Sequence, residues 1–162
     1  MALAYLKARA ALDRADGIQT GATVLGADTV VVKGDRIIGQ PRDAQDARQI
    51  IHLLRGGRHR VVTGMALLAH GRPRRVIVDV ATVTFGPVPD ESIAAYIDSG
   101  QWRGKAGGYN LFERTNAGWP LSVQGDPTTV VGLPMRLLLR ELGPLTIHTP
   151  TRGVPGGTTV PQ

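Results

Sequence analysis

Residues 24 to 32 read VLGADTVVV, a run of β-branched and small side chains that predicts a buried strand over residues 23 to 32. Asp28 lies inside this strand, and an ionised carboxylate there is costly unless another group pairs with it. The residue types leave three roles open for Asp28: a metal ligand, a general base or a structurally paired acid. Gly26 indicates that a ligand or another stretch of backbone comes close. Thr29 points to the opposite face of a regular strand, or toward a pocket if the strand ends there.

The segments around this strand predict an α/β domain in which helices flank a mixed, twisted sheet. We expect further strands at residues 36–38, 59–70 and 74–85, the last two joined as a hairpin. We expect helices at residues 1–15, closed by residues 16–17, at 43–55, at 89–100 and from 134 onward. Asp43 is the expected N-cap of the second helix, and Pro134 the first residue of the last one. Residues 101–127 are expected to be rich in loops.

The composition fits one globular domain and excludes cysteine chemistry. The 162 residues include no cysteine, so neither a disulfide framework nor a thiolate zinc site is available. No apolar run is long enough to cross a membrane and residues 1–17 lack a secretory signal, so we expect a cytoplasmic protein. The net charge of +6 fits either a solvated basic surface or a polyanionic ligand, which would be a nucleic acid or a nucleotide polyphosphate.

A second candidate for chemistry is the stretch GQWRGKAGGYN at residues 100–110. Lys105 precedes a segment with almost no side chains, which can bring backbone N–H groups to a phosphate beside the lysine charge. The alternative is a glycine-rich turn with an exposed lysine. The spacing is not that of a P-loop.

Other polar and aromatic residues suit either chemistry or structure. His59 starts a strand and is a candidate acid–base group, although a hydrogen-bonded structural role is commoner there. Trp102 and Trp119 could stack on a base or anchor loops. Asp79 and Asp126 are expected to be structural or solvated.

Five segments, in this order, resemble the Maf family of nucleoside triphosphate pyrophosphatases. They are VLGADTVVV (24–32), GQPRDAQDA (39–47), LRGGRHRVVTG (54–64), SGQWRGKAGGY (99–109) and GDPTTVVGLP (125–134). The resemblance runs from about Val24 to Leu142. It implies the α/β architecture of the inosine-triphosphate pyrophosphatases, with a cleft across an elongated mixed sheet.

The resemblance also implies an activity and roles for five residues. The family cleaves a nucleoside triphosphate between the α- and β-phosphates with a divalent cation, Mg²⁺ or Mn²⁺. By resemblance Asp28 is the proton acceptor and a ligand of the cation, and Thr29 is tied to substrate choice. Lys105 is placed for the phosphates, and Lys7 resembles a lysine that the family carries in a helix. Gln40 occupies a substrate-binding position where the family has lysine, in glycine-lysine-proline, so a positive charge is absent there.

The sequence departs from the family in two further respects. The family begins with a strand and a serine–arginine–arginine loop, followed by a glutamate used at the metal site. We therefore expect a single Maf-like domain over residues 1–148 without those features, with an exposed sheet edge and a disordered tail over residues 149–162. The family's glutamine after KAG-Y is also absent, with Phe112 or Glu113 near its position.

These departures keep two functions open. The first is hydrolysis of a nucleoside triphosphate, with dTTP and UTP the substrates of one family subgroup and modified guanosine triphosphates those of another. The alternative is a catalytically weak or inactive module that binds nucleotide and acts through a partner. We expect a homodimer, as is common in the family, and neither a membrane nor nucleic acid among the partners.

Overall fold

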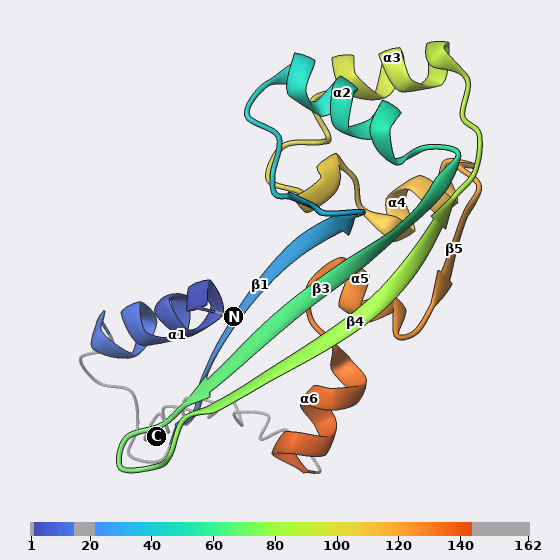
Figure 1. Cartoon of the computed structure of the whole chain (residues 1–162). Coiled ribbons are helices and arrows are strands. Elements are labelled where there is room, and N and C mark those ends of the chain that lie inside the picture. Colours follow the sequence, from blue (N-terminus) through green and yellow to red (C-terminus); the bar gives the residue numbers. More distant parts are fainter. Residues whose placement is uncertain (1, 15–21, 144–162) are drawn as a thin grey trace, which may run out of the picture.

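The computed structural model describes residues 2–14 and 22–143, and its elements confirm the α/β class with flanking helices (Figure 1). The strands are β1 Val24–Lys33, β2 Arg36–Ile38, β3 Gly57–Leu68, β4 Arg75–Phe85 and β5 Leu121–Gln124. The helices are α1 Ala2–Arg14, α2 Ala44–Leu54, α3 Asp90–Asp98, the 3₁₀ turn η1 Ala106–Gly108, α4 Leu111–Asn116, α5 Pro127–Val131 and α6 Met135–Leu142. The predicted end of the first helix at residues 16–17 and the predicted disordered tail lie outside the described residues.

The described strands form one sheet in the order β2-β1-β3-β4-β5. All four neighbouring pairs are antiparallel, so within the described residues the sheet is antiparallel rather than mixed as expected. The reason lies in the connections. Short connections join β1 to β2 and β3 to β4, and a short connection reverses the chain, so the strands of each pair run antiparallel. Longer segments that contain helices connect β2 to β3 and β4 to β5, and they too bring the next strand in antiparallel to its neighbour in the sheet.

One side of β1 is open over most of its length. β2 pairs only with residues Val31 to Lys33 of β1, while β3 pairs with β1 from Val24 to Val32 on the other side. Among the described residues, no strand therefore pairs with residues 24–30 of β1 on the β2 side. Asp28 and Thr29 lie in the middle of this open edge.

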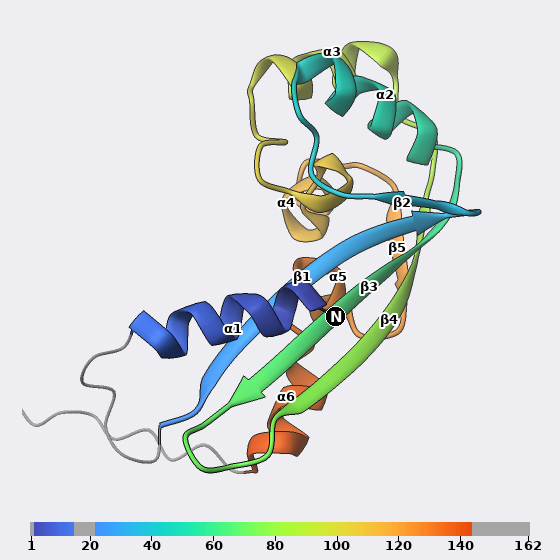
Figure 2. The same ribbon diagram turned by 60° about the vertical axis from the view of Figure 1, so that its left-hand side comes forward.

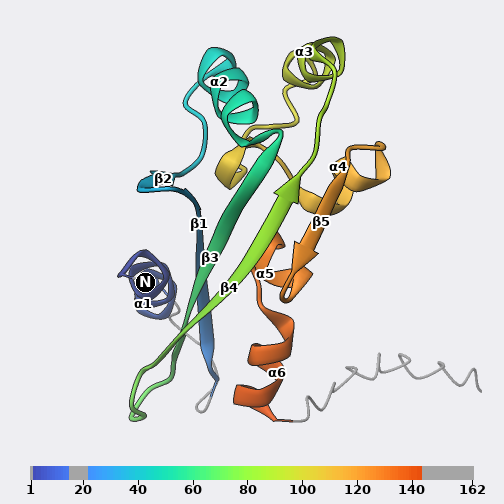
Figure 3. The ribbon, with the colours of Figure 1, turned by 45° about the vertical axis from the view of Figure 1, so that its right-hand side comes forward.

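Helices cover both faces of the long strands, as alternate residues of β3 show. Ala66 and Leu68 pack with α1, whereas Met65 and Leu67 pack with Leu138 of α6. Successive side chains of a strand point to opposite faces. Helices α1 and α6 therefore lie on opposite faces of the sheet, as Figures 2 and 3 show.

The main hydrophobic core lies at the other end of the sheet, beneath α2 and α3 (Figure 1). The carboxylate of Asp43 accepts a hydrogen bond from the backbone N–H of Asp46 at 2.8 Å, which confirms the predicted N-cap of α2. Ala47, Ile51 and Leu54 form the buried face of this helix. At its C-terminus Lys33 donates to a main-chain carbonyl, a partner that helix ends favour.

The section predicted as loops contains η1, α4 and β5. Asn110 caps α4 by accepting from the backbone N–H of Glu113 at 3.1 Å, and Asp126 caps α5 by accepting from that of Thr128 at 2.9 Å. These helices have five and six residues, too few for a helical repeat of apolar residues to be visible in the sequence. Pro134 is the N-cap of α6 rather than its first helical residue.

Candidate active site

Asp28 is held by a helix that packs very closely on its strand. The Nζ of Lys7, on α1, lies 2.7 Å from a carboxylate oxygen of Asp28 and also donates to the carbonyl oxygen of Ala27 at 3.3 Å. A Cβ on Gly26 would lie 2.6 Å from the backbone nitrogen of Ala8, so only glycine lets α1 approach this far. The close approach expected at Gly26 is therefore that of another backbone, and it brings Lys7 to Asp28.

Thr29 points to the other face of the sheet. Its hydroxyl oxygen lies 2.8 Å from that of Thr63, its direct neighbour on β3, and the hydroxyl of Thr63 donates to the carbonyl oxygen of Thr129 on α5 at 2.8 Å. Asp28 and Thr29 thus leave opposite faces of one strand. They still reach the same space, because β1 has an open edge at this point.

Two loops face this edge. The backbone N–H of Gly107 donates to the carbonyl oxygen of Gly39 at 2.9 Å, which ties the segment with Lys105 to the segment with Gln40. Lys105 forms an ion pair with Glu113 of α4. The lysine of the glycine-rich segment therefore lies at this edge of the sheet, and its ion-pair partner is the carboxylate of Glu113.

A pocket of about 220 Å³ brings together all five residues expected at the site. Lys7, Asp28, Thr29, Gln40 and Lys105 line it, although they come from α1, β1 and two loops. The sequence did not predict the seven other lining residues, which are Ala27, Gly104, Ala106, Tyr109, Asn110, Val130 and Val131. Tyr109 and the valines belong to the quoted motifs, and the capping pattern of Asn110 and Glu113 was a visible signal for a short helix beside the site.

The pocket offers one carboxylate to a divalent cation. Asp28 is the only acidic residue among those that line it, and the described residues contain no cluster of three or more acidic, histidine or cysteine side chains. Mg²⁺ in phosphate-transfer sites is commonly held by one or two carboxylates together with substrate oxygens and water. The residues present fit such a cation, with Asp28 as the protein ligand.

His59 has a structural environment. It is 3% exposed, and its Nε2 lies 2.7 Å from the hydroxyl oxygen of Tyr109, whose ring forms part of the pocket wall. Burial, followed by the charge of Lys33, lowers the pKa of His59 from 6.5 to about 4, and burial raises the pKa of Tyr109. His59 does not line the pocket. It supports the wall through Tyr109.

The remaining candidates lie in structural positions. Trp102 is buried with its indole N–H donating to the carbonyl oxygen of Ile97 at 3.0 Å, and Trp119 is buried in the main core. Asp79 accepts from the hydroxyl of Thr129. The hydrogen bonds that Asp126 receives as a helix cap, first of all from the Thr128 side chain, lower its pKa.

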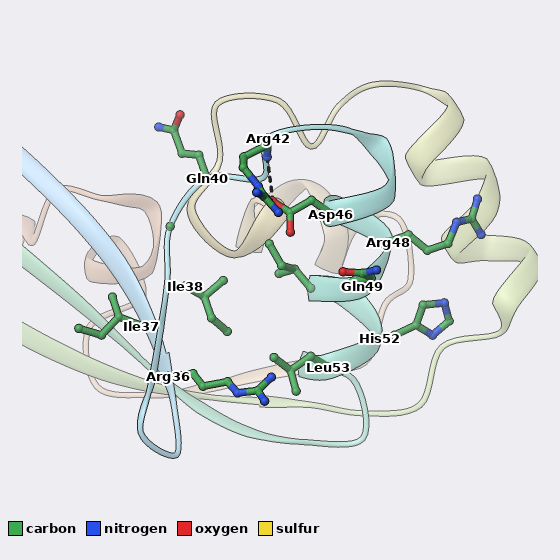
Figure 4. Close-up of a pocket in the computed structure, with 12 residues that line it drawn as sticks. Arg36, Ile37, Ile38, Gln40, Arg42, Asp46, Arg48, Gln49, His52 and Leu53 are labelled. Carbon is green, nitrogen blue, oxygen red and sulfur yellow. Dashed lines mark hydrogen bonds and ion pairs between the residues drawn. The ribbon is translucent and has the colours of Figure 1, made fainter.

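A larger cavity of about 900 Å³ lies between β2 and α2 (Figure 4). Its lining combines apolar side chains such as Ile38 and Leu53 with Arg36, Arg42 and Arg48. Gln40 lines both cavities, so the two are neighbours. The larger cavity contains none of the other residues predicted for the site.

Comparison with known proteins supports the resemblance seen in the motifs. The family model described as Maf-like protein matches residues 1–145. A dTTP/UTP pyrophosphatase of Rhizobium meliloti (strain 1021) is 41% identical over 131 residues, 80% of this chain and 63% of the relative. That of Ruminiclostridium cellulolyticum is 41% identical over 137 residues (84% and 68%), and that of Salinibacter ruber 39% over 122 residues (75% and 60%). The chain thus spans 60 to 68% of the length of these relatives. None of its described helices is long and apolar enough to cross a membrane.

Proposed function

The chain belongs to the Maf-like protein family, and on that premise we propose that it hydrolyses dTTP or UTP to the nucleoside monophosphate and pyrophosphate. The observation that carries the proposal is the convergence of Lys7, Asp28, Thr29, Gln40 and Lys105 on one pocket. The choice of nucleotide rests on the relatives, which are named dTTP/UTP pyrophosphatases. We place this reaction in one domain over residues 1–148 and in the cytoplasm, and we propose a homodimer, which measurement of the mass in solution would test.

Asp28 is the proposed general base. Its carboxylate lines the pocket and is 16% exposed, so a water molecule can reach it. It would accept the proton of the water that attacks the triphosphate. Lys7 holds the carboxylate in position at 2.7 Å in the free protein. When a triphosphate enters, the Lys7 ammonium has a second anionic partner within reach.

Lys105 and Lys7 supply the positive charge for the phosphates. Both ammonium groups line the pocket, where fixed charges stabilise the negative charge that develops on transferred phosphates. Lys105 would exchange its ion pair with Glu113 for one with phosphate. A divalent cation held by Asp28 and the substrate, Mg²⁺ or Mn²⁺, would supply further charge neutralisation.

The proposal is tested by incubating the chain with dTTP, UTP, CTP and GTP in the presence of Mg²⁺ or Mn²⁺ and measuring pyrophosphate. We expect pyrophosphate and the monophosphate in equal amounts, and none without the cation. Release of inorganic phosphate with the nucleoside diphosphate would contradict the proposed position of cleavage. The matched control is Asp28→Asn, which keeps the size of the side chain but removes the base.

The second candidate function is nucleotide binding without turnover. Gln40 favours it, because this neutral side chain lines the pocket where the family has a lysine. Calorimetric titration with UTP separates the two candidates. Binding in the micromolar range with no pyrophosphate released over hours would favour the binding module.

A further inference from the structure

A further cavity, of about 400 Å³, lies between α3 and α4, a volume within the range of small-molecule sites. Its walls come from these two helices, which Figure 3 shows with α3 above α4, and from residues 87–89 and 117–120. It shares no lining residue with the proposed active site or with the cavity between β2 and α2. A ligand here would therefore be bound separately from the substrate.

Arg114 of α4 is the only charged residue among the described residues that line this cavity. Its Cζ lies 4.3 Å from the ring centre of Tyr96 and 5.5 Å from that of Trp119. One terminal nitrogen, Nη2, donates to Oε1 of Gln101 at 2.7 Å. The aromatic rings stabilise the positive charge, and together with Gln101 they hold the guanidinium plane in one orientation.

The charge of Arg114 has no anionic partner in the part of the chain that the structure describes. Glu113, its neighbour in sequence, pairs with Lys105, and Asp90 at the start of α3 pairs with Arg55. The Nε of Arg114 is buried without a hydrogen-bond partner among the described residues, so the terminal nitrogens are the donors that remain for the cavity. Half-buried arginines are ordinarily paired, and an anion in the cavity would supply the absent partner.

Two other side chains offer hydrogen-bond donors to the same space. Because Oε1 of Gln101 accepts from Arg114, the NH₂ group of this amide remains able to donate. Ser92 is exposed and lines the cavity with a hydroxyl, whereas the hydroxyl of Ser99 donates to a backbone carbonyl. No carboxylate lies among the lining residues that the structure describes. A cation, an amide NH₂ and a hydroxyl form a wall that suits a carboxylate or a phosphate group.

The rest of the wall is apolar and rigid. Three exposed prolines, Pro87, Pro89 and Pro120, line the cavity beside Trp119. The proline ring fixes its own backbone angle, so this surface keeps its shape without a ligand. Such a wall suits the apolar part of an organic molecule better than a free inorganic ion.

We propose that this cavity binds a small organic anion whose carboxylate or phosphate group contacts Arg114. The planar guanidinium can meet two oxygens of such a group at once. The amide of Gln101 and the hydroxyl of Ser92 then donate to the same group, and the prolines contact the body of the ligand. This inference does not depend on the proposed function, because it uses none of the residues around Asp28.

The test is a titration with benzoate, phenyl phosphate and inorganic phosphate, followed by two-dimensional NMR of the indole N–H groups. The chain has two tryptophans, of which Trp119 lines the cavity and Trp102 does not, so Trp102 is an internal control. We expect the Trp119 signal to shift saturably with an organic anion while that of Trp102 stays. The tighter of the two organic probes identifies the anionic group. Inorganic phosphate should bind about threefold or more weakly, since it has no apolar part.

Three variants place the anion. Arg114→Gln should weaken binding about tenfold or more, because a charge-assisted contact is lost. Arg103→Gln is the matched control: Arg103 lies 4.7 Å from the ring centre of Trp102 in a similar stack but does not line the cavity, so affinity should be unchanged. Lys105→Ala removes a phosphate contact of the proposed active site, and the Trp119 shift should persist. Turnover of UTP by Arg114→Gln should equal that of the wild type.

The inference is overturned if neither organic anion shifts Trp119 saturably at tens of millimolar, or if Arg114→Gln binds as tightly as the wild type. Loss of the shift in Lys105→Ala would also overturn it, since the anion would then lie in the proposed active site. If thermal unfolding shows that Arg114→Gln does not fold, Gln101→Met decides instead, because Gln101 is exposed and tolerates replacement. Its affinity should fall about threefold to tenfold, the range of one hydrogen bond, and an unchanged affinity would exclude the site.

Discussion

The two neighbouring cavities differ in size and in chemistry, and the smaller one has the composition of an active site. The cavity between β2 and α2 measures about 900 Å³, and the pocket at the open edge of β1 about 220 Å³. Within the larger cavity the one acidic residue, Asp46, is paired with Arg42, and its pKa is lowered first by a hydrogen bond from the Arg42 backbone. In the smaller pocket two ammonium groups and a carboxylate converge from distant segments. A candidate active site needs reactive side chains within reach of one another as well as a cavity.

The difference follows from how the two cavities are built. The larger one is formed by elements adjacent in sequence, β2 and α2, and exposed side chains such as Ile37 and Arg42 border it. The smaller one exists because α1 packs closely on Gly26 and because two loops are tied together by the bond from Gly107 to Gly39. Tertiary packing therefore holds the smaller pocket in shape.

The largest expected effect is that of Asp28→Asn in the smaller pocket. Asparagine cannot accept the proton of the attacking water, so we expect kcat to fall about a hundredfold to ten-thousandfold. The measurement is pyrophosphate release at saturating UTP, with circular dichroism as the control for folding. A folded variant with unimpaired turnover would exclude Asp28 as the base and reopen the larger cavity as the site.

The wall of the smaller pocket should respond to acid through His59. Its pKa of about 4 in the folded protein lies below its ordinary value of 6.5, so the unfolded chain takes up a proton first as the pH falls. Its contribution to stability is present above pH 6.5 and is lost between pH 6.5 and 4, up to about 3 kcal/mol. Urea unfolding at pH 7, 5.5 and 4 measures this loss. Between pH 7 and 4, the free energy of unfolding of His59→Gln should fall by up to about 3 kcal/mol less than that of the wild type. An equal fall in both proteins would contradict the role of His59 in this pH dependence.

Gln40 borders both cavities, and its replacement by lysine tests whether phosphates bind beside this position. If phosphates bind in the smaller pocket, Gln40→Lys adds a positive charge beside them, and we expect kcat/KM to rise about tenfold. Gln40→Met is the matched control, with similar length and no charge. A lower kcat/KM in Gln40→Lys would mean that the phosphates lie elsewhere.

The sequence was sufficient for β1 to β4 and for the hairpin, and the five residues predicted for the site line one pocket, but the sequence does not show how these segments meet. The pattern around Asp28 and the cap at Asp43 are local, and local patterns predict strands and helix ends. Contacts between distant segments determine the open edge of β1 and the antiparallel order of the sheet. They also determine the hydrogen bonds that connect Thr29, Thr63, Thr129 and Asp79. Thr63 in particular has no local signal, because a threonine in a strand is ordinary until its partner on α5 is known.

The smallest effect should come from the larger cavity. Arg48 lines it and does not line the smaller pocket, so we expect Arg48→Ala to change kcat and KM for UTP by less than about twofold, as for surface substitutions far from a functional site. The measurement is the same pyrophosphate assay, with Lys105→Ala as the comparison. Loss of the Lys105 ammonium from the smaller pocket should raise KM and lower kcat together, because this charge faces both substrate and transition state. If Arg48→Ala instead raised KM tenfold and Lys105→Ala did not, the nucleotide would bind between β2 and α2, and the convergence at Asp28 would be structural.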